Sequence, residues 1–235
     1  WEEEAVGSDL TPVEVRQTDL AYYAALDPPA FALAGRWVEL QSAMYAHLQR
    51  FKLRLSDIKV ESSTANPGDL SVVCWMFNYG ALARYRLDRV EVWSNNPRLA
   101  GDVGLVRDMV VQTMEVLRSV SPDSRVTVHT VNAALHGALP GQGEVAARVA
   151  SYVTKRPDGP PPLTPSGVSF LCEFPSGEGQ GSIILEQSTL VPGGAFLRVM
   201  SEHLGSLSES EALDRATGFF QAATTRLGLD VVWGT

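Results

Sequence analysis

Apolar residues recur along this chain at two spacings, one typical of helices and the other of strands. Five of them fall on one helical stripe and predict an amphipathic helix over residues 35–51: Trp37, Leu40, Met44, Leu48 and Phe51. A second helix is expected from Asp102 to about residue 120, because the apolar residues that follow Asp102 share one face. A third is expected from Ser208, which forms a capping box with Glu211, to the terminating Gly228.

The N-terminal segment also predicts a helix. Thr11 is a good N-cap, Pro12 suits the first helical position, and Glu14 completes a capping box. The two prolines after Asp27 would end this helix, because proline cannot continue one. The chain begins with the acidic run Trp1–Glu4. We therefore expect residues 1–34 to be an acidic tail followed by a helix.

Alternating apolar and polar residues predict strands between the helices. The first three are expected at 58–61, at about 70–79 and at about 82–94, with Gly80 in a tight connection before the third. In that third strand the apolar positions are odd up to Leu87 and even from Val90, which predicts a β-bulge near Asp88-Arg89. Further strands are expected at 125–135, 168–172, 182–185, 195–200 and 229–233, with a helix at about 145–153.

The order helix, three strands, helix, strand thus occurs twice, over residues 35–138 and 143–235. We expect an α+β fold of two similar α-β-β-β-α-β halves, packed as a pseudo-two-fold body. Its sheets would be mainly antiparallel, with helices on one face. A three-stranded sheet with one helix leaves a face and its edges uncovered, so two such units are expected to pair. The cleft between them would be the default ligand site.

Composition narrows the class of protein and of partner. The chain has 235 residues, of which 45% are hydrophobic and 20% charged, as in ordinary globular proteins. No apolar run approaches the roughly 20 residues of a membrane span. The net charge of −8 disfavours nucleic acid and anionic membranes as partners and favours a basic protein.

The two cysteines give an indication of the cellular compartment. Cys74 and Cys172 each lie in an apolar, strand-like run, which favours buried, reduced thiols and a cytoplasmic location. The acidic first residues do not resemble a basic signal peptide. Because the chain starts at Trp1 instead of Met, a removed targeting segment remains an open alternative.

The chain carries no strong signature of catalysis or of a cofactor. None of the four histidines has metal-ligand spacing, so we expect no metal, and we expect no other cofactor. His129 and His136 differ by an odd number and would point to opposite faces of a strand. The glycine-rich stretch 177–181 precedes strand-like residues, which favours a hairpin turn over a phosphate-binding loop.

Three groups of residues remain as a candidate binding site. The aromatic cluster near residue 77 indicates a covered central strand or an aromatic-lined cavity. Two arginines share one face of the next strand, where they would either line a pocket for an acidic ligand or be solvated side chains. A histidine beside Glu202 is either a general base or an exposed strand-end residue. The candidates are Trp75, Phe77, Tyr79, Arg84, Arg86 and His203.

Several segments resemble an uncharacterised, sporadically distributed family of bacterial proteins of about this length. The similar stretches, about half of the chain, are Tyr85 to Trp93, the helix from Val103 to Leu117, Val126–Asn132 and the closing helix with Phe219-Phe220 and Thr224–Arg226. An Arg-Tyr-Ile-Asn-like run of that family is only partly matched here, because His129-Thr130 stands where its Arg-Tyr would be. The resemblance implies a two-lobed bacterial α+β protein and supplies no catalytic residues.

These observations favour binding over catalysis. The element order is also similar to that of acidic secretion chaperones, which pair small α-β units to hold an extended client. Our first hypothesis is a non-enzymatic protein-binding or assembly module that offers a sheet edge or groove to a protein partner. The alternatives are a small-molecule-binding protein or enzyme with a cavity near Trp75 and Tyr79, and a structural subunit of a larger complex.

Overall fold

Long antiparallel strands organise the computed structural model, which describes residues 10–61, 70–95, 100–141, 143–153, 165–174 and 178–232. Its strands are β1 (Thr11–Asp27), β2 (Ile58–Glu61), β3 (Ser71–Met76), β4 (Ala81–Arg86), β5 (Arg89–Asn95), β6 (Arg125–Ala138), β7 (Gly167–Glu173), β8 (Gly179–Gln187), β9 (Ala195–Leu204) and β10 (Leu229–Val232). Its α-helices are α1 (Ala32–Gly35), α2 (Trp37–Leu48), α3 (Ala100–Val120), α4 (Glu144–Tyr152) and α5 (Glu209–Arg226), with short 3-10 turns at Gln49–Phe51 and Leu55–Asp57.

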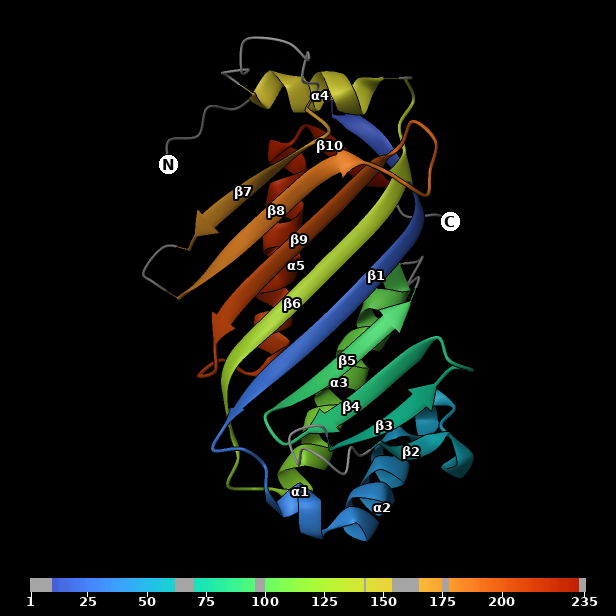
Figure 1. Ribbon diagram of the computed structural model, residues 1–235, viewed down its shortest axis with the longest axis vertical. Helices are drawn as coiled ribbons and strands as arrows, with labels where there is room; N and C mark the ends of the chain where they lie inside the picture. The colour runs from blue at the N-terminus through green and yellow to red at the C-terminus, as the bar shows by residue number, and fades with distance from the viewer. Residues whose placement is uncertain are drawn as a thin grey trace.

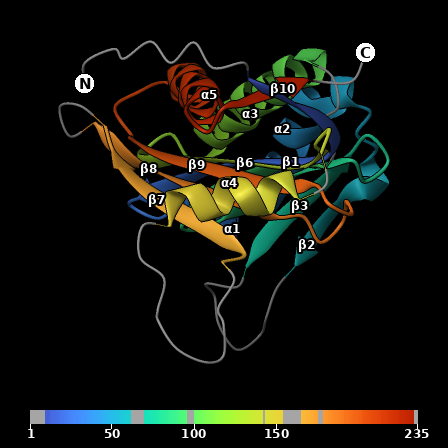
Figure 2. The ribbon, with the colours of Figure 1, turned by 90° about the horizontal axis from the view of Figure 1, so that it is seen from above.

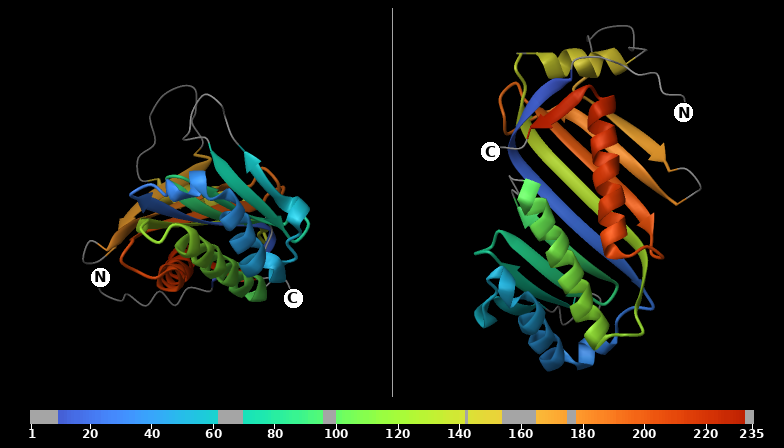
Figure 3. Two further views of the ribbon diagram at one scale, coloured as in Figure 1. Left: turned by 90° about the horizontal axis from the view of Figure 1, so that it is seen from below. Right: turned by 180° about the vertical axis from the view of Figure 1, so that it is seen from behind.

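The strands join into one sheet in the order β2-β3-β4-β5-β1-β6-β9-β8-β7, and β10 pairs with β1 (Figure 1). Every pair is antiparallel except that of β1 with β10. The fold is therefore α+β with a mainly antiparallel sheet, as the sequence predicts. Figure 2 shows α2, α3 and α5 on the same side of this sheet, and Figure 3 shows α3 and α5 lying across that side.

The predicted helix after Thr11 is wrong, because residues 11–27 form β1 at the centre of the sheet. β1 pairs with β5 on one side and with β6 on the other, and two long hydrogen-bonded ladders outweigh a local capping signal. From Thr18 to Leu26 the even-numbered side chains point into the core, among them Leu20, Tyr22 and Ala24. The residues between them are also largely apolar, so the sequence shows no clear alternation here. The acidic tail expected at residues 1–4 lies outside the described residues.

The expected bulge near Asp88-Arg89 is also wrong, because the chain reverses there and forms two strands. Tyr85 pairs with Val90 and Ala83 with Val92, so β4 and β5 are a hairpin. Directly opposite residues of an antiparallel pair point to the same face. Each pair joins an odd to an even residue number, so the change from odd to even apolar positions marks a reversal of the chain.

The other predicted elements are confirmed with small shifts of their ends. In α2 the residues Leu40, Met44 and Leu48 are buried, as their helical spacing predicts. At the start of α5 the Ser208–Glu211 capping box is formed, and after it Gly228 has the left-handed φ of 68°. Among the helices of the described residues, none combines the length and apolar character needed to cross a membrane.

Two clusters of buried side chains join the sheet to its helices. The larger packs α2 and α3 against β1 and β3–β5, and it also contains Val131 of β6 and Leu213 of α5. The smaller packs α4 and α5 against β6, β8 and β9, and it contains Val13 of β1. Each cluster thus includes residues from the other half of the sheet, so the two ends of the chain share their cores.

Candidate functional site

Three of the predicted site residues lie together on one face of the sheet. Trp75, Arg84 and Arg86 alternate with residues that pack under α2 and α3, such as Cys74 and Tyr85, so their side chains point away from those helices. We call this side of the sheet the outer face. Tyr79 joins the group, because its ring lies 5.4 Å from that of Trp75.

The two arginines are held by carboxylates of the same region. Arg84 Nη1 donates to Glu91 Oε2 at 3.3 Å, and its Nη2 lies 3.7 Å from Glu61 Oε2. Arg86 Nε lies 3.7 Å from Asp88 Oδ1. Because these guanidinium groups already have anionic neighbours, this part of the face has little positive charge to offer an acidic ligand.

Phe77 belongs to a turn of unusual backbone conformation. Phe77, Asn78 and Tyr79, which link β3 to β4, have φ angles of 51°, 55° and 71°. The left-handed region is unfavourable for residues other than glycine, so this run holds strain. Phe77 packs edge-on against Phe51, with ring centroids 6.1 Å apart, while Tyr79 is 53% exposed. The aromatic cluster is therefore divided between the core and the outer face.

His203 lies far from the other predicted residues, near the end of β9. It and Glu202 are consecutive in the strand and point to opposite sides, so they do not form an acid–base pair. His203 is 2% exposed; its Nε2 lies 3.1 Å from Ser201 Oγ, and its ring stacks on Phe174 at 5.4 Å. Burial lowers the pKa of His203, with a further lowering by the charge of Arg215.

The register of the strands reveals a set of residues that sequence reasoning did not group. One straight row crosses the outer face from β3 to β7, and we call it the outer row: Trp75, Leu82, Trp93, Ala21, Asn132, Met200, Ser182 and Leu171. Six of these eight side chains are apolar, and Leu171 is 89% exposed. The alternation within each strand marks these residues, but only the strand order shows that they form one row.

Sequence reasoning also missed a buried polar network on the helix side. Tyr22 Oη lies 2.8 Å from Nδ1 of His129, and Nε2 of His129 lies 3.0 Å from the Leu207 carbonyl oxygen. A carbonyl only accepts, so Nε2 carries the proton and Nδ1 accepts the tyrosine hydroxyl hydrogen. Burial lowers the pKa of His129 and raises that of Tyr22 above its usual range.

This network borders a hollow of about 420 Å³ between the end of α3, β6 and the segment before α5. Arg118 and the buried Glu209 form an ion pair in its wall. The hollow contains groups able to donate and accept protons, but within the described residues these groups are hydrogen-bonded or ion-paired.

His136 points the other way from His129, as their spacing predicts, and its Nδ1 lies 2.8 Å from Ser188 Oγ.

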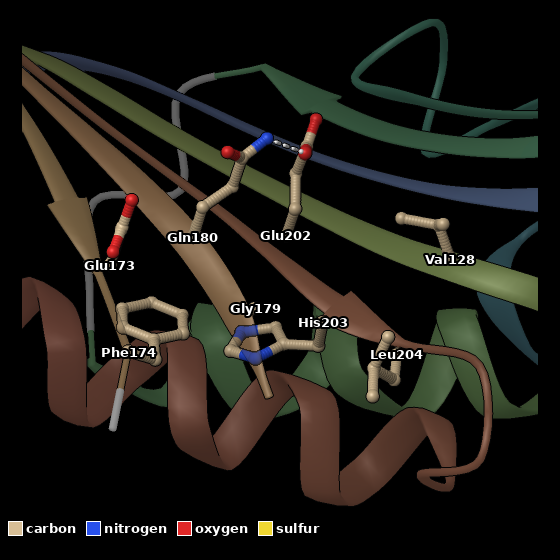
Figure 4. Close-up of a pocket in the computed structure, with 8 residues that line it drawn as sticks. All are labelled: Val128, Glu173, Phe174, Gly179, Gln180, Glu202, His203 and Leu204. Carbon is tan, nitrogen blue, oxygen red and sulfur yellow. Dashed lines mark hydrogen bonds between the residues drawn. The ribbon is translucent and has the colours of Figure 1, made fainter. Parts of the chain in front are cut away.

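A second hollow, of about 400 Å³, lies at the ends of β7, β8 and β9 (Figure 4). We call it the acidic hollow. Its lining includes His203, and neither hollow includes Trp75 or Tyr79, around which the sequence suggested a cavity. The lining residues are Val128, Glu173, Phe174, Gly179, Gln180, Glu202, His203 and Leu204.

Cys74 and Cys172 are both free, and burial raises the pKa of the Cys74 thiol to about 12. The described residues contain no cluster of three or more His, Cys, Asp or Glu side chains suited to a metal ion.

Comparison with known proteins adds no family: the chain matches no protein-family model and no curated protein.

Proposed function

We propose that this protein is a non-enzymatic protein-binding or assembly module whose outer face receives an extended, basic segment of a partner protein. The outer row is the observation that carries the proposal. It offers a line of apolar side chains across eight strands, from Trp75 on β3 to the exposed Leu171 on β7. Leu171 is 89% exposed, Trp75, Trp93 and Met200 are half-buried, and Leu82 and Ala21 are buried, so the row is most open at its β7 end. Exposed apolar side chains in a contiguous patch mark interaction sites.

The charge of the chain and of this face supports a basic partner. The net charge is −8, and Glu173 and Glu202 lie next to the outer row on β7 and β9. Complementary charge raises the rate of encounter and selects among partners. A chain with alternating apolar and basic residues would match an apolar row bordered by carboxylates.

We also propose that the molecule consists of two related units, which together supply the face. β1 and β6 are antiparallel neighbours at the centre, with β5 beside β1 and β9 beside β6. β1 is followed in the chain by α1, α2, the meander β2–β5 and the long helix α3, and β6 by α4, the meander β7–β9 and the long helix α5. These units, β1 to α3 and β6 to β10, differ from the halves 35–138 and 143–235 that the sequence suggests, because β1 is a strand and takes the place of β6 in the first unit. On this proposal the units meet at residues 121–124, and their helices pack on the side away from the outer row.

The proposal is tested with charge substitutions in the outer row. Leu171→Asp and Met200→Asp place a carboxylate in the apolar row, whereas Leu190→Asp makes the same change at a turn residue that is 55% exposed. The wild-type protein and the three variants are purified gently from their own host and weighed by native mass spectrometry. We expect a protein partner to accompany the wild type and Leu190→Asp and to be lost from the two row variants.

Two results would contradict this function. Equal recovery of the partner with all four proteins would place the interface elsewhere. A wild-type mass raised only by a small-molecule increment would support the small-molecule-binding alternative instead. Thermal unfolding of each variant separates loss of binding from loss of the fold.

A further inference from the structure

One border of the sheet is formed by a strand that lacks the features which usually prevent pairing with another chain. β7 is last in the strand order, and Figure 1 shows it at the border of the sheet. Edge strands of natural proteins are commonly short, charged, bulged or interrupted by proline, because an open edge recruits other strands. All seven residues of β7 pair with β8 without a register shift, and the only charged one is Glu173 at its end.

The opposite border of the sheet differs from β7. β2 has four residues, and two of them, Lys59 and Glu61, are exposed charges. Charged side chains on an edge oppose the addition of a further strand. β7 instead carries Leu171, the most exposed large apolar side chain of the described residues. The molecule therefore protects one edge of its sheet and leaves the other open.

The free edge of β7 presents backbone donors and acceptors at alternate residues. Phe174 N–H donates to the Gly179 carbonyl oxygen at 3.1 Å, and Gln187 N–H donates to the Ser166 carbonyl oxygen at 3.3 Å. In an antiparallel ladder every second residue bonds to the same neighbour, so the even-numbered residues of this segment bond to β8. The N–H and C=O groups of its odd-numbered residues therefore point to the free edge.

The side chains of β7 define the two faces that an added strand would continue. On the helix side, Val168, Phe170 and Cys172 pack against the smaller core cluster and are only partly buried. The ring of Tyr152 from α4 meets that of Phe170 at 5.3 Å. Leu171 lies on the outer face. An added strand with apolar residues on the helix side would thus cover the flank of this core.

Carboxylates lie at both ends of this edge on the outer face. Glu173 ends β7, and Glu186 of β8 lies opposite Gly167, at the beginning of β7. A Cβ at Gly167 would lie 2.8 Å from Glu186 Cβ and 3.4 Å from Glu186 Oε2, so this carboxylate reaches over the beginning of the strand. Both glutamates are exposed. The ends of the edge are therefore suited to basic side chains.

The same charges argue against a second copy of the chain as the added strand. Two β7 strands paired antiparallel around Phe170 would place Glu173 of each copy opposite Gly167 of the other, and therefore beside its Glu186. Like charges that lie opposite each other destabilise a strand pair. A strand with basic residues at these two positions would instead form charge-assisted hydrogen bonds with the carboxylates.

We propose that the open edge of β7 binds an extended segment of the partner protein as an additional antiparallel strand. The segment carries basic residues at its two ends, which face Glu173 and Glu186, and apolar residues that continue the helix-side core. Main-chain hydrogen bonds supply its affinity, and alternate side chains supply its specificity. This inference rests on the proposed function for the origin of the segment, and it continues the outer face by one strand beyond Leu171.

The probe is the blocked peptide Lys-Val-Leu-Val-Thr-Val-Lys, whose alternation matches the two faces of β7. Hydrogen exchange of backbone amides is followed by NMR on the full chain. In the free protein we expect fast exchange at Ser169 and Leu171 and slow exchange at Phe170 and Cys172, which bond to β8. An excess of peptide should slow exchange at Ser169 and Leu171 by about tenfold or more.

Two modified peptides of equal composition separate strand addition from general adhesion. N-methylation of the Leu and Thr residues removes the two central N–H donors that would face β7. N-methylation of the first and last Val residues removes two donors that would face away. We expect the first peptide to bind about tenfold or more weakly and the second to bind like the unmodified peptide.

Variants of the protein test the edge and its charges. Ser169→Pro removes an N–H that faces the free edge, where proline is tolerated, and should weaken peptide binding about tenfold or more. Glu173→Gln/Glu186→Gln should weaken it about threefold or more. The control Glu39→Gln/Glu115→Gln removes the same charge from α2 and α3 and should leave binding unchanged. Thermal unfolding shows that each variant is folded.

Three results would overturn the proposal. Unchanged exchange at Ser169 and Leu171 in a large excess of peptide would exclude strand addition, and so would equal affinities of the two methylated peptides. Protection of these amides that appears without peptide and rises with protein concentration would make a second copy of the chain the occupant.

The outcome is separate from that of the outer-row experiment. Met200 lies on β9, two strands away from the edge, so loss of the partner from Met200→Asp would support the outer face even if strand addition fails. Conversely, strand addition by the peptide together with a partner unaffected by Met200→Asp would retain the edge and remove the outer face as the binding site.

Discussion

At the scale of single residues, three histidines have pKa values that are lowered by burial. His129 lies between the Tyr22 hydroxyl and the Leu207 carbonyl oxygen, where a neutral ring satisfies both partners. Burial is the largest influence on its pKa and lowers it, while Glu209 acts in the opposite direction. Burial also lowers the pKa of His136 and of His203. In all three cases the folded chain favours the uncharged ring.

This arrangement predicts that the protein loses stability on mild acidification. The unfolded chain takes up protons near the ordinary histidine pKa of about 6.5, whereas the folded chain does so at lower pH. The free energy of unfolding should therefore fall as the pH drops from about 7 to about 5.5, by up to about 1.4 kcal/mol per pH unit for each histidine. Urea unfolding across this range measures the slope.

The variant His129→Asn tests which residue is responsible. It should reduce the slope of unfolding free energy against pH, whatever its effect on stability at neutral pH. The remaining slope would come from His136 and His203. A slope identical to that of the wild type would show that His129 does not contribute.

At the scale of elements, the end of α2 carries a residue in an unfavourable conformation. Lys52 follows the 3-10 turn Gln49–Phe51 with φ 61° and ψ 29°, and its backbone N–H donates to the Gln49 carbonyl oxygen. Its side chain is exposed. A left-handed residue at the end of a helix is usually glycine, because a Cβ is costly there.

Lys52→Gly should therefore stabilise the protein. Relief of the backbone conformation, less the added entropy of the unfolded chain, gives an expected gain of about 0.5–1 kcal/mol. The control is Lys59→Gly in β2, where the chain is extended and glycine should cost about 0.5–1 kcal/mol. Urea unfolding gives both changes. Destabilisation by both substitutions would contradict the role assigned to Lys52.

At the scale of the whole molecule, the central pair β1–β6 ties the two ends of the sheet together. The register of this pair runs from Glu14 with Ala138 to Asp27 with Arg125. Val131 lies in the core beneath α2 and α3, and Val13 lies in the core beneath α4 and α5. Neither end of the sheet therefore completes its core without the other.

We expect the fragments 1–120 and 121–235 to be unfolded alone and to fold when mixed. Separated fragments lose the β1–β6 ladder and expose the central strands, so each lacks part of its hydrophobic core. Circular dichroism and two-dimensional NMR of each fragment and of the mixture provide the measurement. A dispersed NMR spectrum from either fragment alone would show that the halves are independent domains.

The sequence by itself determined the elements whose signals are local. The apolar stripe of α2 and the capping box of α5 predict their helices because neighbours within a few residues fix both patterns. The mainly antiparallel α+β class also follows from short alternating strands between such helices. Of the candidate site, the sequence placed Trp75, Arg84 and Arg86 on strands but did not show what lies beside them.

Tertiary structure decided everything that depends on which strands become neighbours. β1 is a strand because β5 and β6 bond to both its edges, although Thr11 and Glu14 resemble a helix start. The outer row exists only once the strand order is known, because Leu171 and Trp75 lie at opposite ends of a line that the chain crosses out of sequence. The pairing of Glu173, Gln180 and Glu202 likewise joins residues of three strands. Such long-range contacts leave no mark in a local pattern, since the free energy that selects them is gained only when the whole sheet assembles.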